Sequence, residues 1–147
     1  MKKVKLIIED KDAVVEFSNM FRECASIEEV DLTECNTSNF NEWSYSFFQT
    51  NGLKRILGDL DLSQATIGSY IFFASILEEV RIVPNTINIS IRFNSAKLTQ
   101  ASIESIINGL ADLTGKDPQT LTLNGVGRNL TEEQKARISA KNWTLAY

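Results

Sequence analysis

An internal repeat is the feature of this sequence that most restricts its fold. Aliphatic residues, each directly preceded by a charged residue, recur at intervals of 24, 26 and 24 positions, at Leu6, Val30, Ile56 and Val80. In the last three copies another aliphatic residue stands three positions earlier, at Ile27, Leu53 and Leu77. A period of about 20 to 50 residues is typical of architectures in which similar short units stack on one another.

We interpret each copy as a short strand followed by a turn that brings the next strand alongside it. Because successive side chains of a strand face opposite sides, the aligned aliphatic residues should share the buried side. Ten of the thirteen aromatic residues lie between positions 17 and 73 and are predicted to form the spine of the stack, with Phe21, Phe47 and Ile71 in equivalent positions. The alternative is an ordinary aromatic core in a domain without repeats.

Two neighbouring segments, Phe21–Thr33 and Asn36–Phe47, resemble the BspA-like leucine-rich repeat. In that family a phenylalanine and small residues precede Leu-x-x-Leu-Asp-Leu-Ser, and a Thr-Ser-Asn element follows. The next unit keeps Leu53, Ile56 and the stretch Asp61-Leu62-Ser63, and the resemblance weakens toward residue 93. It implies an α/β fold: a short leucine-rich repeat solenoid with irregular, aromatic-rich repeats and a C-terminal helix-strand-helix-strand cap.

The chain is therefore expected to form a single domain over residues 1–147. Residues 1–18 are a first strand or degenerate repeat, 19–93 the repeats and 94–147 the closing segment. Terminal units of stacked proteins need a polar outer face to stay soluble, which is the role expected of the closing segment.

The closing segment carries two helix signals. Leu98, Thr99 and Ile103 have the spacing of a hydrophobic staple around an N-cap, and the apolar face that follows predicts a helix ending at Gly115. Thr131 and Gln134 form a capping-box pattern that predicts a second helix to about Lys141. Strands are predicted at residues 86–93, 120–123 and 143–147.

Histidine is absent, which excludes Ser-His-Asp and Cys-His catalysis and His-ligated zinc. The net charge of −4 argues against nucleic-acid binding. Cys24 and Cys35 provide at most two soft zinc ligands and favour a reducing compartment. The family resemblance places Cys24 at a small buried position, while the role of Cys35 stays open. No cofactor or metal is expected.

Membrane insertion is not expected, because the longest apolar runs, Val4–Ile8 and Ile71–Ile76, are far shorter than the roughly 20 residues of a spanning helix. The apolar stretch near the start ends at Ile8 and runs into acidic residues, so we expect no signal peptide and synthesis in the cytoplasm.

Paired carboxylates are the only candidates for acid–base catalysis, at Glu28-Glu29, Glu78-Glu79, Asp59/Asp61 and Glu132-Glu133. The first two pairs occupy the same repeat position, which a solvated repeat surface explains. Gly125-x-Gly127 lies between a predicted strand and helix, but the glycine of a dinucleotide fingerprint is replaced by Leu130, so a tight turn is the better interpretation.

Two rows of exposed residues should cross the neighbouring strands. Lys5, Glu29, Arg55 and Glu79 would form an alternating row of charges that stabilises the sheet. The next row mixes aliphatic and charged residues, as binding faces do, and is our predicted partner-binding site: Ile7, Asp31, Leu57 and Arg81.

These observations predict a non-enzymatic interaction or structural module with a protein partner. The resemblance further implies a bacterial adhesion role or a place in a bacteriophage virion or tail. The alternative is a small carbohydrate-active hydrolase using paired carboxylates. A homo-oligomer is also predicted if edge strands such as Val4–Ile8 pair between copies.

Overall fold

Parallel sheets and two α-helices make up the fold in the computed structural model, which describes residues 2–147. The strands are β1 (Lys3–Ile7), β2 (Val15–Glu16), β3 (Glu29–Glu34), β4 (Phe40–Glu42), β5 (Arg55–Leu60), β6 (Gly68–Phe72), β7 (Glu79–Ile82), β8 (Ile91–Phe93), β9 (Gln119–Leu123) and β10 (Trp143–Ala146). The helices are α1 (Gln100–Gly109) and α2 (Glu132–Ala140), and short 3₁₀ turns span Thr37–Asn39 and Gly127–Asn129. None of the helices within residues 2–147 is long and apolar enough to cross a membrane.

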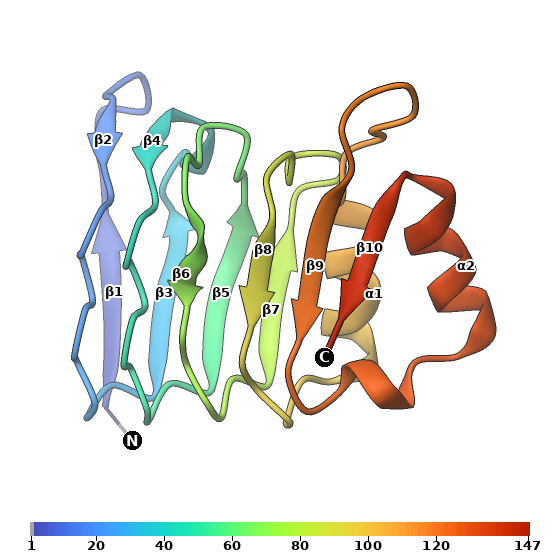
Figure 1. Cartoon of the computed structure of the whole chain (residues 1–147). Coiled ribbons are helices and arrows are strands. Elements are labelled where there is room, and N and C mark those ends of the chain that lie inside the picture. The colour runs from blue at the N-terminus through green and yellow to red at the C-terminus, as the bar shows by residue number, and fades with distance from the viewer. Residues whose placement is uncertain (1) are drawn as a thin grey trace.

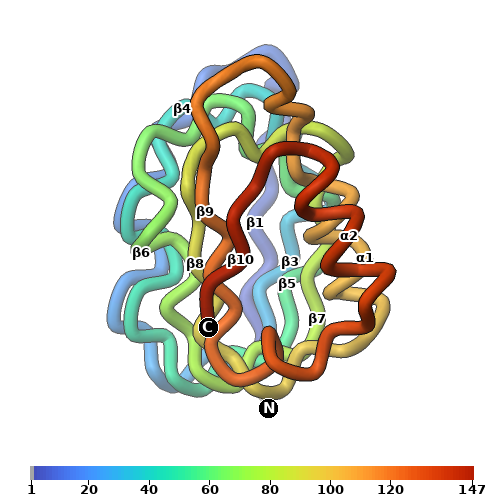
Figure 2. The backbone as a smooth tube through the Cα atoms, turned by 45° about the vertical axis from the view of Figure 1, so that its right-hand side comes forward, coloured from blue at the N-terminus to red at the C-terminus, as the bar shows by residue number. Residues whose placement is uncertain are grey.

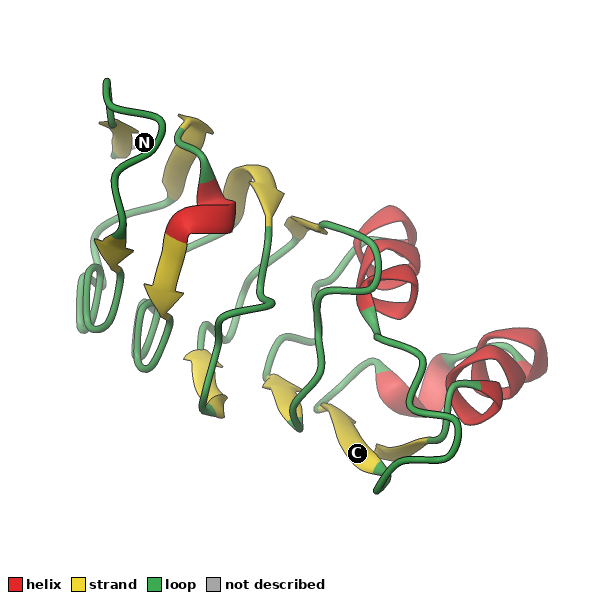
Figure 3. Ribbon diagram, turned by 90° about the horizontal axis from the view of Figure 1, so that it is seen from above, coloured by secondary structure: helices red, strands yellow, loops and turns green. Residues whose placement is uncertain are grey.

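The strands form two rows that face each other, with the helices at one end (Figure 3). The first sheet has the order β1-β3-β5-β7 and the second sheet the order β6-β8-β9-β10, while β2 pairs with β4. All these strand pairs are parallel. The chain advances from β1 at one end to α1, α2 and β10 at the other (Figure 1), and Figure 2 brings that second end forward.

In the first sheet, strands one repeat apart pair with each other: Lys3 with Glu29, Val4 with Val30, Glu29 with Arg55, and Arg55 with Glu79. The predicted alignment is therefore confirmed for Val30 with Ile56, and for the third copy through Arg55 and Glu79, but it is wrong for Leu6, whose place Val4 takes. Val4 and Leu6 lie on the same face, so alternation cannot distinguish a shift of two residues. The structure fixes the register through a hydrogen bond from Glu28 N to Lys2 O of 2.9 Å.

A ladder of aromatic rings runs through the core across the repeats. Phe21 stacks on Phe47 and Phe47 on Phe72, each at 5.8 Å between ring centroids, and Phe72 stacks on Phe93 at 4.7 Å. The predicted aromatic spine is confirmed in part: Phe72, not Ile71, follows Phe47, and Tyr70 is 40% exposed rather than part of the core. Ile71 is also buried, and its carbonyl accepts the hydrogen bond from Phe47 N at 3.0 Å.

Both helices begin where their capping residues predict. Thr99 Oγ1 accepts a hydrogen bond from Ser102 N, and Thr131 and Gln134 form the reciprocal capping box. Helix α1 ends at Gly109 rather than Gly115, because Leu110 turns into extended backbone and bridges Ile87.

Two further expectations need correction. The strand predicted over residues 86–93 is shorter, since only Ile91–Phe93 pairs as β8 and Ile87 makes an isolated bridge. Cys24 is half-buried, not buried, and so is Cys35, whose Sγ donates to Leu6 O at 3.3 Å. Burial raises the pKa of the Cys35 thiol.

Candidate functional site: a groove between the first sheet and helix α1

An alternating row of charges crosses the outer face of the first sheet at the start of its strands. It contains Lys3, where Lys5 was expected, followed by Glu29, Arg55 and Glu79. The Glu29 carboxylate lies 3.4 Å from Lys3 Nζ and 3.0 Å from Arg55 Nε, and its side chain is only 10% exposed. The hydrogen bond from Arg55 lowers the pKa of Glu29, so this carboxyl stays ionised. These ion pairs hold the strands together and leave Glu29 little capacity for another ligand.

The predicted partner-binding row is only partly assembled. Asp31 and Leu57 are neighbours, as expected, but Ile7 lies opposite Glu34 and Arg81 lies opposite Asp59. The register shifts along both strand pairs, once between Lys5 and Ile7 and once between Arg55 and Asp59. Such extra residues interrupt the ladder and displace every residue beyond them.

Gly58 is the residue that allows the second shift. Its φ of 104° lies in the region that other residues rarely adopt. A Cβ added there would lie 3.1 Å from the carbonyl carbon of Leu32 and 3.2 Å from Thr33 N. The irregular turn of β5 therefore packs directly against β3, and it moves Arg81 beside Asp59.

A groove of about 650 Å³ lies between the first sheet and α1. Leu57 and Arg81 line it from the sheet and Ala101 lines it from the helix, while Thr33 and Glu79 complete its rim. It brings together two of the four predicted binding residues, because Asp31 and Ile7 are not part of its lining.

Helix α1 forms the wall of this groove by covering the edge of β7 with serine side chains. Ser102 Oγ accepts a hydrogen bond from Val80 N at 3.1 Å, and Ser105 Oγ accepts one from Ile82 N at 2.9 Å. Ser102 Oγ also donates to Glu78 O at 3.0 Å. The two hydroxyls thus satisfy backbone groups that another strand would otherwise pair with.

The sequence motifs did not mark Ser102, Ser105 and Ala101 as site residues. Their signal was present: Ser102 and Ser105 are three positions apart, and residues three apart lie on the same side of a helix. The information that was missing is that this helix lies beside β7.

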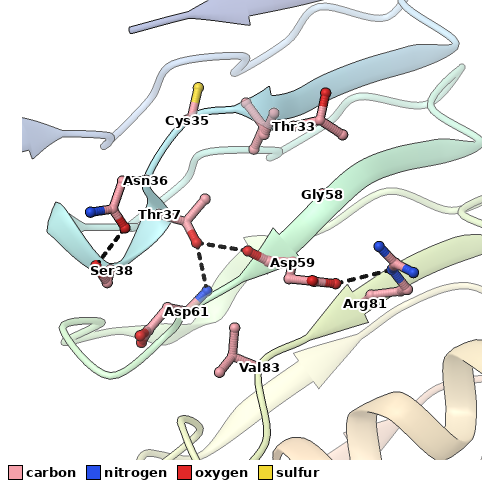
Figure 4. A pocket seen from close by; sticks show the side chains of 11 residues that line it. Thr33, Cys35, Asn36, Thr37, Ser38, Gly58, Asp59, Asp61, Arg81 and Val83 are labelled. Atoms are coloured by element: carbon pink, nitrogen blue, oxygen red, sulfur yellow. Dashed lines mark hydrogen bonds and ion pairs between the residues drawn. The ribbon is translucent and has the colours of Figure 1, made fainter. Parts of the chain in front are cut away.

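A smaller pocket of about 340 Å³ contains Asp59 and Asp61, one of the predicted carboxylate pairs (Figure 4). The Asp59 carboxylate forms an ion pair with Arg81 Nε at 3.0 Å. Asp61 Oδ1 accepts a hydrogen bond from Ser63 N at 2.9 Å. Thr37 Oγ1 links the two backbones by donating to Asp59 O at 2.7 Å and accepting from Asp61 N at 3.0 Å. The polar groups of Asp59, Asp61 and Thr37 in this pocket are therefore already engaged in contacts within the chain.

The other predicted pairs lie elsewhere. Glu29 belongs to the charge row, Glu79 lies on the rim of the groove, and Glu132 and Glu133 are exposed in the first turn of α2. Gly125 adopts a φ of 92° in a turn that packs against Ala96. Among residues 2–147 there is no group of three or more Cys, Asp or Glu side chains arranged to hold a metal ion.

Comparisons with protein-family models, with curated proteins and with solved structures find no match for this chain.

Proposed function

We propose that this chain is a non-enzymatic interaction module, a short leucine-rich repeat solenoid of the BspA-like kind, which binds a protein segment in the groove beside α1. Three features support the repeat assignment: strands paired at the repeat interval, parallel order in both sheets, and stacked phenylalanines from successive units. We also propose for this chain the bacterial adhesion or bacteriophage virion role that the family resemblance implies.

The binding proposal rests on the groove beside α1. Its volume of about 650 Å³ lies within the range of about 300–1,000 Å³ common for ligand sites. Leu57 from the sheet and Ala101 from the helix contribute apolar lining, and Arg81 and Glu79 contribute opposite charges. A segment with an aliphatic anchor between a basic and an acidic residue matches this pattern.

The test is to fill the groove without disturbing the fold. Ala101→Trp places a large side chain in the groove from an exposed helix position. Ala136→Trp is the matched control, an exposed alanine in α2 that does not line the groove. We expect a protein captured by the wild type and by Ala136→Trp to be lost with Ala101→Trp. Equal capture by all three proteins, or capture by none, would overturn the proposal.

The hydrolase alternative rests on the pocket that holds Asp59 and Asp61. A glycosidase needs two carboxyls on opposite sides of the scissile bond, one of them able to donate a proton. If this pocket is catalytic, Asp59→Asn and Asp61→Asn should each abolish release of reducing sugar from a polysaccharide panel that the wild type hydrolyses. The absence of any wild-type hydrolysis on the panel would remove this alternative.

A further inference from the structure

Strand β1 is an edge of the first sheet. Among residues 2–147 it pairs with β3 on one side, and no other strand pairs with it. An unpaired strand edge presents backbone N–H and C=O groups that can pair with another chain. The opposite edge of the same sheet, β7, is covered by Ser102 and Ser105.

The side chains of β1 add an apolar contribution to this edge. Val4 and Leu6 of the strand, and Ile8 directly after it, pack against the core but are only partly buried, and Val4 and Leu6 lie on the same face of the strand. On the other face Ile7 is 60% exposed. Adding a strand beside β1 would remove these aliphatic side chains from water.

The charges flanking β1 favour a second copy of the same segment running antiparallel. Lys2 precedes the strand and Lys3 begins it, and Glu9 and Asp10 follow Ile8 just beyond its end. In an antiparallel pair of identical segments, the basic start of each lies beside the acidic end of the other. Such a pair is related by a twofold axis and closes on itself.

Most registers of this pair are unfavourable. If the axis passes through Val4, Lys3 lies opposite Lys5, and if it passes through Lys5, two Lys5 side chains face each other. Like charges directly opposite destabilise a sheet. An axis through Ile7 would place Val4 opposite Asp10, which puts a carboxylate among apolar side chains.

An axis through Leu6 avoids these conflicts. It places Lys5 opposite Ile7 and pairs the apolar residues Leu6 with Leu6 and Val4 with Ile8, and it brings Lys3 toward Glu9, which lies in the bend just beyond the strand. We propose that this chain forms a homodimer in which two copies of β1 pair antiparallel about Leu6, joining the two first sheets into one. The grooves beside α1 lie at the far ends of that sheet and stay accessible, so the dimer presents two binding sites.

Substitutions of Ile7 distinguish this dimer from other associations. In the proposed register Ile7→Lys faces Lys5 of the second copy and should dissociate the dimer, whereas Ile7→Glu faces the same lysine and should retain it. Within one copy Ile7 lies opposite Glu34, so the effects on the folded monomer have the reverse order. A change in monomer stability therefore cannot imitate the expected result.

The experiment is sedimentation equilibrium of the full chain over a wide concentration range, with circular dichroism to confirm folding. We expect a dimer for the wild type, Ile7→Glu and Ala101→Trp, and a monomer for Ile7→Lys. A monomeric wild type, or equal association of Ile7→Lys and Ile7→Glu, would overturn the proposed dimer. Because Ala101→Trp tests the groove separately, failure of the dimer leaves the groove proposal standing.

The register is tested by disulfide trapping. Lys5→Cys and Ile7→Cys proteins are oxidised separately and as a mixture, and the linked peptides are identified by mass. The bond between residues 5 and 7 in the mixture should form far more than the 5–5 or 7–7 bond in either protein alone, because directly opposite residues lie about 4.5–5.5 Å apart at Cα. Equal yields of every combination would contradict this register.

Discussion

The two edges of the first sheet differ in how their backbone groups are satisfied. At β7 the side chains of α1 accept the strand's N–H groups, and the helix contributes buried aliphatic residues such as Ile106 and Ile107. At β1 the aliphatic residues are only partly buried, and within residues 2–147 no helix or strand covers the outer edge. The β7 edge of the sheet is therefore covered by a helix of the same chain, whereas the β1 edge presents backbone groups that can pair with another strand.

The same substitution at the two ends should give the largest difference. Leu110→Ala removes a fully buried side chain beneath the cap and should lower the free energy of unfolding by about 2–5 kcal/mol. Leu6→Ala at the partly buried edge should cost only about 1 kcal/mol, because less apolar surface is lost. Urea unfolding of both variants, at a concentration where the chain is monomeric, measures the difference. Equal losses would mean that the two ends are equally well packed.

The serine contacts at β7 can be removed one at a time. Ser102→Ala leaves Val80 N without its partner in a buried place and should cost about 1–3 kcal/mol, although Glu78 O keeps its hydrogen bond from Thr99 N. Ser105→Ala removes one hydrogen bond at a half-buried position and should cost about 1 kcal/mol. Hydrogen exchange of the Val80 and Ile82 amides provides a direct readout. Unchanged protection in both variants would show that the hydroxyls do not cover this edge.

Acid should weaken the contact between the two helices. Hydrogen bonds from Gln134, and then from Arg137, lower the pKa of Glu104 below its ordinary value of 4.5. A carboxyl whose pKa is lower in the folded state adds stability above its unfolded pKa and loses it as pH falls through the folded pKa. The wild type should therefore exceed Glu104→Gln in stability near neutral pH, and this difference should disappear with acidification. A difference that is constant with pH would contradict this role of the carboxylate.

Several features of the fold were predictable because local chemistry determines them. The N-caps at Thr99 and Thr131 lie where their side chains predict, and the aliphatic repeat at Val30 and Ile56 marks paired strands. Short-range signals of this kind depend on residues only a few positions apart, so a single sequence contains them.

Several of the incorrect predictions depend on distant contacts. Helix α1 ends before Gly115 because Lys141 Nζ donates to Ile107 O at 3.2 Å and Leu110 O at 2.8 Å, while Leu110 bridges Ile87. The register shift at Gly58 moves Arg81 from beside Leu57 to beside Asp59. The groove itself requires α1 to lie beside β7, which no local pattern specifies.

The smallest effect is expected where two charges meet on the exposed surface of the sheet. The Asp59 and Arg81 side chains are 63% and 69% exposed, so water screens their contact at 3.0 Å. Asp59→Asn should change the free energy of unfolding by less than about 0.5 kcal/mol, even though it removes one partner of the ion pair. Urea unfolding in low and high salt measures both the effect and its screening. A loss comparable to that of Ser102→Ala would mean that the Gly58 turn depends on this ion pair, and the register shift would then be an electrostatic as well as a steric feature of β5.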